Sequence, residues 1–254
     1  SMLHQMLRVR WPEWRALPPV RRDEILAHAS GVLTKMEAEG SAVFSLLGHK
    51  GDMMLLHFRQ NFGQLGEAER ALQHLALWDY LELTSSYLSV VELGLYDSTA
   101  KVYTSLAEQG IEPHTPEWNA EIEETLNRQR QAMHPRLFPE MPGHPYLCFY
   151  PMDRRRGEHQ NWYQVPLAER QRMMGEHGAI GRRYAGTVKQ IISGSIGFDD
   201  WEWGVDLFAE DPLVFKKLIY EMRFDEVSAV YALFGTFYVG QRTTATEIGK
   251  LLGL

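Results

Sequence analysis

The chain has 254 residues, of which 44% are hydrophobic, and its formal net charge is -7. A chain of this length can form one large domain or two smaller halves, and the apolar content supports a well-buried core in either case. The acidic balance leaves no basic field for a nucleic-acid backbone, and no apolar run approaches the ~20 residues that a membrane-spanning helix needs. We therefore expect a cytoplasmic protein that binds no nucleic acid and has no membrane-spanning segment.

The sequence contains one cysteine, Cys148. This excludes an intrachain disulfide, and it also excludes a zinc or iron–sulfur site built from the cysteines of this chain alone. A metal must therefore bind through other ligands or arrive within a macrocycle.

The first half of the chain alternates between strand-like and helix-like hydrophobic patterns. The spacing of apolar residues predicts a strand, a helix, a hairpin of two strands, a second helix and a further strand, at residues 3–11, 20–38, 41–47, 52–59, 67–80 and 86–93. The order of these elements is β-α-β-β-α-β.

The second half repeats that order, with a strand, a helix, two strands, a helix and a strand at residues 146–150, 167–184, 188–193, 201–207, 212–232 and 236–239. The sequence therefore predicts an α+β fold with two ferredoxin-like β-α-β-β-α-β units. We expect an N-terminal half at 1–97, a connector at 98–145 with a polar helix near 117–133, and a C-terminal half at 146–254.

Tyr150 ends the first strand of the second half and begins the segment Tyr150-Pro151-Met152-Asp153-Arg154. Alternation along an extended strand places Tyr150 and Met152 on one face, and Arg154 joins them if the strand continues. A redox-capable phenol beside a cation suggests a haem-type site. The alternative is that Tyr150 is an amphipathic core residue.

His177 is a lone histidine in a predicted helix that also contains Gly175, Gly178 and Gly181. Its helical neighbours are largely apolar, and the glycines lower helix propensity without an evident local reason. A flat macrocycle against the helix supplies such a reason, because neutral imidazole is a common axial ligand of haem iron. The alternative is a satisfied histidine in the core.

Three further residues are candidates for binding an iron porphyrin. Gln190 alternates with β-branched residues, so its uncharged amide needs a partner on an apolar face, and it cannot serve as a proton-transfer base. Arg136 and Arg154 are candidates for holding carboxylates, because a guanidinium binds a carboxylate in a bidentate manner. Solvated surface arginines are the alternative.

With these residues in view, the chain resembles the chlorite dismutase superfamily and, within it, the coproheme decarboxylases. The likeness is dense between residues 146 and 240, in CFYPMDRRR, NWYQVP, EHGAIGRRYAG, VKQIISGSIGFDDWEWGVDLFAEDPLVFKKLIYEMRFDEVSA and FGTFYVG. It is looser in the first half, in LHQMLRVRWPEW, GHKGDMMLLHFR and SYLSVVELGLY.

The resemblance implies an enzyme that uses hydrogen peroxide to remove two propionates from iron coproporphyrin III (coproheme), which gives haem b through a three-propionate intermediate. It implies that His177 is the proximal iron ligand, that Tyr150 is the catalytic tyrosine and radical carrier, and that the protein is a homopentamer. The residues that it places against the porphyrin are Arg136, Tyr150, Pro151, Met152, Asp153, Arg154, Gln190 and Ser228.

The sequence departs from the family pattern in three places. Arg154 stands where a lysine is usual, the connector is longer and more helical, and the usual N-terminal extension is missing.

Three alternative functions stay open: a protein that stores or delivers haem without turnover, a chlorite dismutase, and a cofactor-free ferredoxin-like binding module. Gln190 stands where a chlorite dismutase has its distal arginine, which disfavours the second.

Overall fold

The computed structural model describes residues 1–91 and 115–253. The first half forms one ferredoxin-like unit, in which strands pair in the order β4-β1-β3-β2. Its elements are β1 (Met2–Val9), α2 (Pro19–Ala38), β2 (Ser41–Leu46), β3 (Met53–Phe58), α3 (Phe62–Gln73) and β4 (Leu81–Val91). A short helix, α1 (Trp11–Ala16), and a 3-10 turn, η1 (Ala76–Tyr80), are additions that the periodicity did not predict as separate elements.

The second half forms another unit of the same kind, with strand order β6-β7-β5-β9. Its elements are β5 (Tyr146–Arg154), η2 (Trp162–Gln164), α6 (Leu167–Arg183), β6 (Lys189–Gly194), β7 (Trp203–Ala209), α7 (Leu213–Met222), η3 (Val227–Tyr231), β8 (Ala232–Phe234), β9 (Tyr238–Thr243), η4 (Ala245–Glu247) and α8 (Ile248–Leu251). The short β8 pairs with the end of β5. The two predicted ferredoxin-like units are thus confirmed.

The two units join edge to edge. Strand β2 pairs with β9, and β4 pairs with β6, so the nine strands belong to one continuous sheet. The additional pairing of β7 with β5 closes this sheet into a barrel. Its interior is filled by buried side chains from both halves, among them Phe44, Leu56, Phe149 and Phe208.

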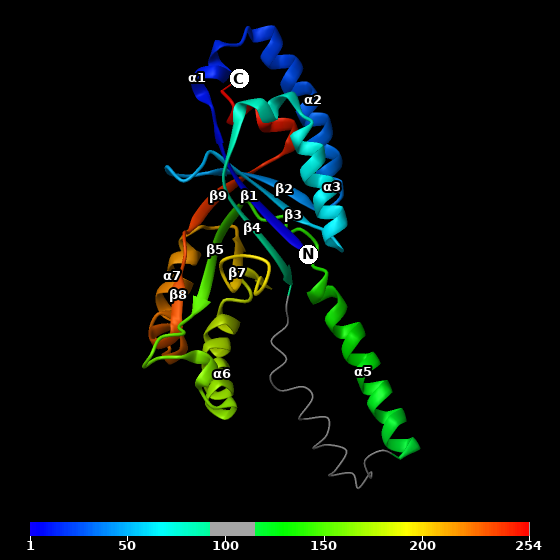
Figure 1. Cartoon of the computed structure of the whole chain (residues 1–254), viewed down its shortest axis with the longest axis vertical. Helices are drawn as coiled ribbons and strands as arrows, with labels where there is room; N and C mark the ends of the chain where they lie inside the picture. The colour runs from blue at the N-terminus through cyan, green and yellow to red at the C-terminus, as the bar shows by residue number, and fades with distance from the viewer. Residues whose placement is uncertain (92–114, 254) are drawn as a thin grey trace.

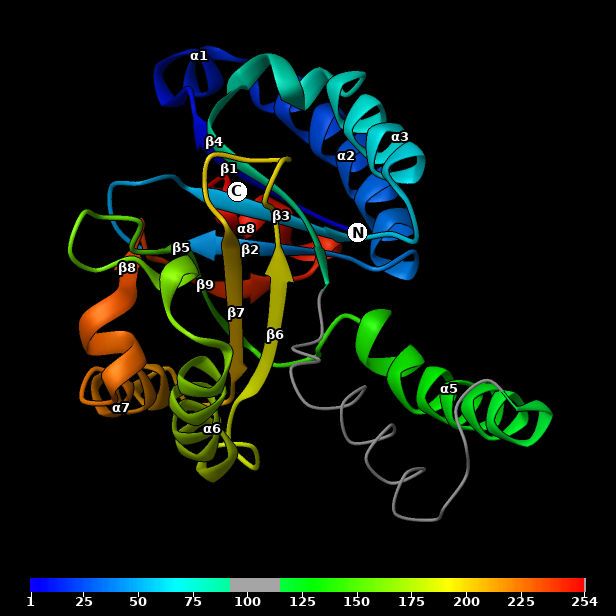
Figure 2. The same cartoon turned by 60° about the horizontal axis from the view of Figure 1, so that its bottom comes forward.

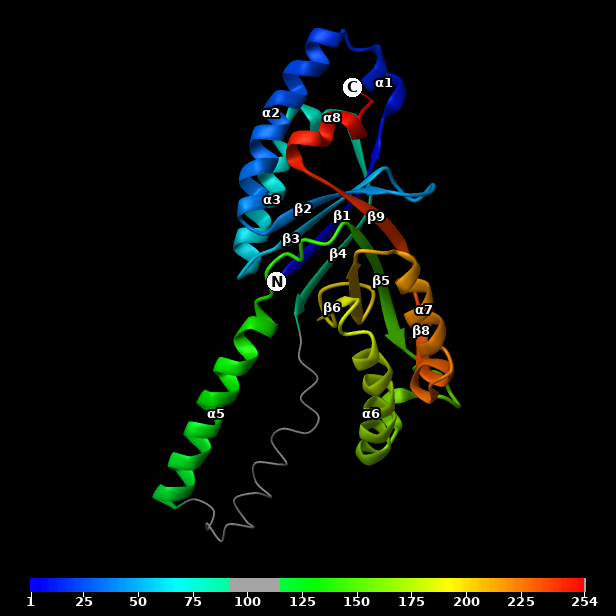
Figure 3. The same cartoon turned by 180° about the vertical axis from the view of Figure 1, so that it is seen from behind.

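Helices cover the outside of the barrel at two separate places. Helices α2 and α3 pack on the first unit, while α6 and α7 lie on the second (Figures 1 and 2). Helix α5 (Pro116–Leu137) belongs to neither layer and projects away from the barrel (Figure 3). None of the described helices combines the length and the apolar character that a membrane span requires.

The predicted helix at 212–232 is wrong in its second part. Helix α7 ends at Met222, and a turn follows before the π-helical η3. The reason is Asp225, whose carboxylate accepts a hydrogen bond from the backbone N–H of Ser228 at 2.7 Å and so starts a new turn. The helix at 67–80 likewise divides into α3 and η1, and the last strand runs over Tyr238–Thr243.

The division into two halves and a connector at residues 97 and 145 stays a prediction. Strand β4 ends at Val91 and β5 begins at Tyr146, and α5 occupies much of the interval. Residues 98–114 of the predicted connector lie outside the described residues.

Candidate functional site

Strand β5 places Tyr150 on the outer face of the barrel wall, opposite Phe149 on the inner face. Tyr150 is 5% exposed and packs in the cluster between the sheet and helices α6 and α7. Its ring stacks on Phe237 with the centroids 4.4 Å apart, and Phe234 lies 5.8 Å away. The predicted alternation along this strand is confirmed, because Met152 belongs to the same outer cluster as Tyr150.

The surroundings of Tyr150 keep its phenol protonated. Burial raises the pKa of Tyr150 well above its usual value, the neighbouring Cys148 acts in the same direction, and the nearby cations Arg223 and Arg154 reduce the effect without reversing it. A phenol in this state does not act as a base at neutral pH. It can give up a hydrogen atom, and the phenoxyl radical formed in that way can take one up.

His177 lies on α6 with one ring nitrogen already engaged. Its Nδ1 is 2.8 Å from Oδ2 of Asp225 and 3.4 Å from Oγ of Ser228. Burial of Asp225 opposes its ionisation, but the hydrogen bonds from His177 and from the backbone of Ser228 outweigh this and lower the pKa of Asp225. Because an ionised carboxylate only accepts hydrogen bonds, Nδ1 is the donor in this contact, and in the neutral ring the lone pair of Nε2 is then the one that a ligand can use.

The predicted residues His177 and Ser228 are therefore brought together, whereas Asp225 was missed by the sequence reasoning. A signal for Asp225 does exist. An aspartate three residues before a serine, inside an unusually long predicted helix, is typical of a helix start, where an aspartate side chain caps a backbone amide.

The glycines of α6 differ in their surroundings. A Cβ placed on Gly175 would meet no atom within 4 Å. A Cβ on Gly181 would lie 3.3 Å from Cε of Met222 and 3.8 Å from Oε1 of Gln190. The amide of Gln190, on β6, thus reaches α6 one turn after His177, which puts an uncharged polar group on the same side of the sheet as the histidine.

Two arginines oppose the raised pKa of Tyr150 through their charge. Arg154 is 8% exposed, its Nη2 lies 3.6 Å from Sδ of Met174 on α6, and its guanidinium stands over the ring of Trp162. The guanidinium of Arg223 lies over Phe234, 3.8 Å from the ring centroid. The sequence reasoning missed Arg223, because the predicted helix runs on to residue 232 and an arginine within such a helix is usually solvated.

A buried carboxylate anchors the end of β5. Glu202 is 6% exposed and accepts a hydrogen bond from the backbone N–H of Arg154 at 3.0 Å, and its own N–H donates to Oδ1 of Asp153 at 2.8 Å. Pro151 lies at the same end, where its carbonyl accepts a hydrogen bond from Gly235. The side chain of Asp153 thus holds backbone, and its predicted contact with a porphyrin stays a prediction.

Arg136 stands apart from these residues. It is exposed in the last turn of α5, and no hydrogen bond or ion pair joins it to the other predicted site residues within the described ranges. The adjacent Leu137 lines a cavity of about 1040 Å³ beside α2 and α3, which also touches Met36 and Phe58. None of the predicted site residues, Arg136 included, lines that cavity.

The side chains at this site suit an iron porphyrin better than a bare metal ion. No group of three or more histidine, cysteine, aspartate or glutamate side chains could hold a bare metal ion in the described part of the chain. One imidazole with its second nitrogen held by a carboxylate suits an axial position on an iron that a macrocycle already binds. Tyr150 is buried beside this helix, and Arg154 and Arg223 supply positive charge that suits the carboxylates of such a macrocycle.

Comparison with known proteins assigns the chain to a family. The model of the family described as chlorite dismutase matches residues 22–243. The chain belongs to the chlorite dismutase family. A family relative from Staphylococcus saprophyticus subsp. saprophyticus, named coproheme decarboxylase, is 42% identical over 258 residues, which cover 99% of this chain and 95% of that protein.

Two other similar proteins have names that concern heme. A protein of Haloquadratum walsbyi whose name proposes heme binding is 42% identical over 99% of this chain, but the chain spans only 45% of that protein's length. The solved structure of a heme-binding protein from Thermus thermophilus is 37% identical, with a TM-score of 0.84, and the match covers 100% of this chain and 94% of that one.

Proposed function

We propose that the protein is a coproheme decarboxylase, which uses hydrogen peroxide to convert two propionates of iron coproporphyrin III into vinyl groups and so gives haem b. The observation that carries this proposal is that one chain combines His177, whose Nδ1 is held by Asp225, with Tyr150, a buried and protonated phenol under the influence of two cations. The relative from Staphylococcus saprophyticus supports it.

Each of the site residues has a part that follows from its chemistry. His177 binds the iron through Nε2, while Asp225 fixes the ring and raises its donor strength. Arg154 binds a propionate carboxylate, because a guanidinium stays charged when it is largely buried. Gln190 presents an uncharged amide, which can orient a bound oxidant but cannot take a proton from it.

Tyr150 transfers the hydrogen atom. The bound iron porphyrin, once oxidised by hydrogen peroxide, supplies the oxidising equivalents and takes up the electron left at the end. Tyr150 loses its phenol hydrogen as a proton and an electron, and its oxygen then takes a hydrogen atom from the β-carbon of a propionate. The phenol is thereby restored, the bond to the carboxylate breaks, and carbon dioxide leaves as the vinyl group forms.

The test is a single-turnover reaction followed by mass spectrometry. Wild-type protein loaded with ferric coproporphyrin III and treated with hydrogen peroxide is expected to lose two molecules of carbon dioxide in sequence, through a three-propionate intermediate. Tyr150→Phe should bind the porphyrin without turnover. Tyr146→Phe is the matched control, because Tyr146 lies on the same face of β5 and in the same cluster. An active Tyr150→Phe variant, or an inactive wild type, refutes the proposal.

A second candidate function is haem binding without turnover. The names of the Haloquadratum and Thermus proteins favour it. It predicts a Soret band on addition of ferric haem and an unchanged porphyrin mass after peroxide. The same experiment therefore separates the two functions.

We also propose a cytoplasmic homopentamer, and the membership of the chlorite dismutase family supports that assembly. Analytical ultracentrifugation of the porphyrin-loaded protein is expected to give five times the mass of the chain. A monomer or dimer as the main species would contradict it.

A further inference from the structure

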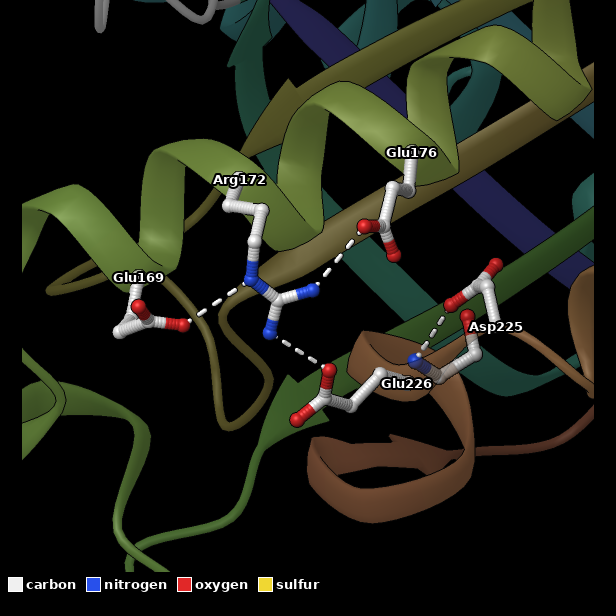
Figure 4. Close-up of polar contacts among 6 residues, drawn as sticks. Glu169, Arg172, Glu176, Asp225 and Glu226 are labelled. Atoms are coloured by element: carbon white, nitrogen blue, oxygen red, sulfur yellow. Dashed lines mark hydrogen bonds and ion pairs between the residues drawn. The ribbon is translucent and has the colours of Figure 1, made fainter.

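Helix α6 is connected by two polar contacts to the turn at residues 225–226, which follows α7. His177 contacts Asp225 at 2.8 Å, and Arg172 Nη2 contacts Oε2 of the next residue, Glu226, at 2.7 Å. Figure 4 shows Arg172 reaching from α6 toward Glu226, with Asp225 beside it on the same turn. The two contacts differ in solvent exposure, since the side chain of Asp225 is 3% exposed and that of Glu226 is 47% exposed.

The guanidinium of Arg172 is aimed by its own helix. Nε contacts Glu169 and Nη1 contacts Glu176, each at 3.0 Å, so that Nη2 points to Glu226 (Figure 4). Hydrogen bonds to Glu226, Glu169 and Glu176, in that order of strength, raise the pKa of Arg172. A planar guanidinium with two nitrogens fixed presents the third in a defined direction. Of the three carboxylates, only Glu226 lies off α6.

The position of this turn matters for His177. Asp225 accepts hydrogen bonds from the backbone N–H of Ser228 through Oδ1 and from Nδ1 of His177 through Oδ2. Because Glu226 follows Asp225 directly in the chain, a displacement of Glu226 moves the carboxylate that fixes the imidazole. An outer partner of a metal-binding histidine sets the orientation and donor strength of its ring.

We propose that Arg172 is a positioning residue for His177, which acts by tying Glu226 to α6 and thereby holding Asp225 against the imidazole. This inference rests on the proposed function in one respect, namely that His177 binds the iron. Arg172 itself contacts neither porphyrin nor iron.

The first arm of the test uses the full chain without porphyrin. The hydrogen-exchange rate of the Ser228 amide reports the contact with Asp225 directly, since that N–H is the donor. Arg172→Gln and Glu226→Gln should each raise this rate about two- to fivefold, as expected for loss of an exposed ion pair. Glu169→Gln is the matched control, because it also removes the charge of one ion pair of Arg172, but its amide oxygen can still accept from Nε, so the guanidinium stays directed at Glu226 and that ion pair remains. It should leave the rate unchanged.

The second arm uses protein loaded with ferric coproporphyrin III. Arg172→Gln and Glu226→Gln should shift the iron–histidine stretching frequency of the reduced complex in the same direction, and the double variant should shift it no further. High salt should shift the iron–histidine frequency of the wild type toward that of the variants, because the ion pair between Arg172 and Glu226 is exposed to solvent. Glu169→Gln should keep the wild-type frequency.

The outcomes separate the two proposals. Unchanged Ser228 exchange in Arg172→Gln and Glu226→Gln, or an equal change in Glu169→Gln, overturns the positioning role and leaves Arg172 as a stabiliser of α6. A wild type that binds no ferric porphyrin, or a His177→Ala variant that keeps the iron–histidine band, overturns the proposed function instead. The exchange arm decides the link between Arg172 and Asp225 in either case.

Discussion

His57 provides a pH-dependent contribution to stability whose size follows from its surroundings. The side chain is fully buried at the end of β3, and its Nδ1 is 2.8 Å from Oγ of Ser41. Oγ of Ser41 also accepts a hydrogen bond from Nη2 of Arg59. Burial first, then the charges of Arg59 and His4, lower the pKa of His57 from 6.5 to about 3. Protonation would add a buried positive charge near an arginine.

A histidine whose pKa is lower in the folded state than in the unfolded state binds its proton preferentially on unfolding. Its contribution to stability is therefore complete above pH 6.5 and is lost as the pH falls from there toward about 3. The limiting slope is about 1.4 kcal/mol per pH unit, which amounts to about 2 kcal/mol between pH 7 and pH 5. That value changes little for any folded-state pKa below about 4.

Urea unfolding at pH 7 and pH 5 measures this loss. His57→Asn keeps an acceptor near Ser41 and should remove about 2 kcal/mol of the pH dependence, whatever its effect on stability at pH 7. His28→Asn is the matched control, because His28 is exposed on α2. If His57→Asn and wild type lose the same free energy between the two pH values, His57 is not the responsible group.

Three further predictions concern the site and the barrel. Asp225→Asn places an amide where a carboxylate held His177 and should weaken ferric porphyrin affinity about 10- to 100-fold in a Soret titration, and an unchanged affinity would separate Asp225 from iron binding. Arg154→Leu should raise KM for iron coproporphyrin III about tenfold or more with little change in kcat, because the variant loses a contact with a propionate. A tenfold fall in kcat instead would assign Arg154 to the chemical step. Gly204→Ala should lower the free energy of unfolding by about 1–3 kcal/mol, because the added Cβ lies 2.5 Å from Cε1 of Tyr87. Gly175→Ala is the control, since a Cβ there meets no atom within 4 Å and should not lower the free energy of unfolding.

The order of the elements was predictable from the sequence because both units repeat the same hydrophobic pattern. Alternation along β5 was also predictable, since Phe149 and Tyr150 are buried in different clusters on opposite faces of the sheet. The closure of the barrel was not. It depends on the pairing of β2 with β9 and of β4 with β6, and hydrophobic alternation does not specify which strand edge meets which.

The candidate site was predictable only where a residue type limits the chemistry. His177 and Tyr150 attract notice as a lone imidazole and a phenol at a strand end. Asp225 and Arg223 do not, because they fall in a stretch whose apolar spacing continues the helical pattern past Met222. The break after Met222 arises from a carboxylate that contacts a backbone amide and a histidine on another element, and a contact of that kind leaves little trace in local periodicity.

Two histidine–aspartate pairs in this fold show what decides whether an imidazole can bind a ligand. His4 contacts Asp206 at 2.9 Å inside the barrel, where both side chains are fully buried and His4 stacks on Phe149. His177 contacts Asp225 at nearly the same distance, but its side chain is 21% exposed on the outside of the barrel wall. A carboxylate partner fixes the ring in both pairs, and coordination also needs open space on the other nitrogen. Burial therefore separates the histidine that connects the two halves of the barrel from the one that we propose to bind iron.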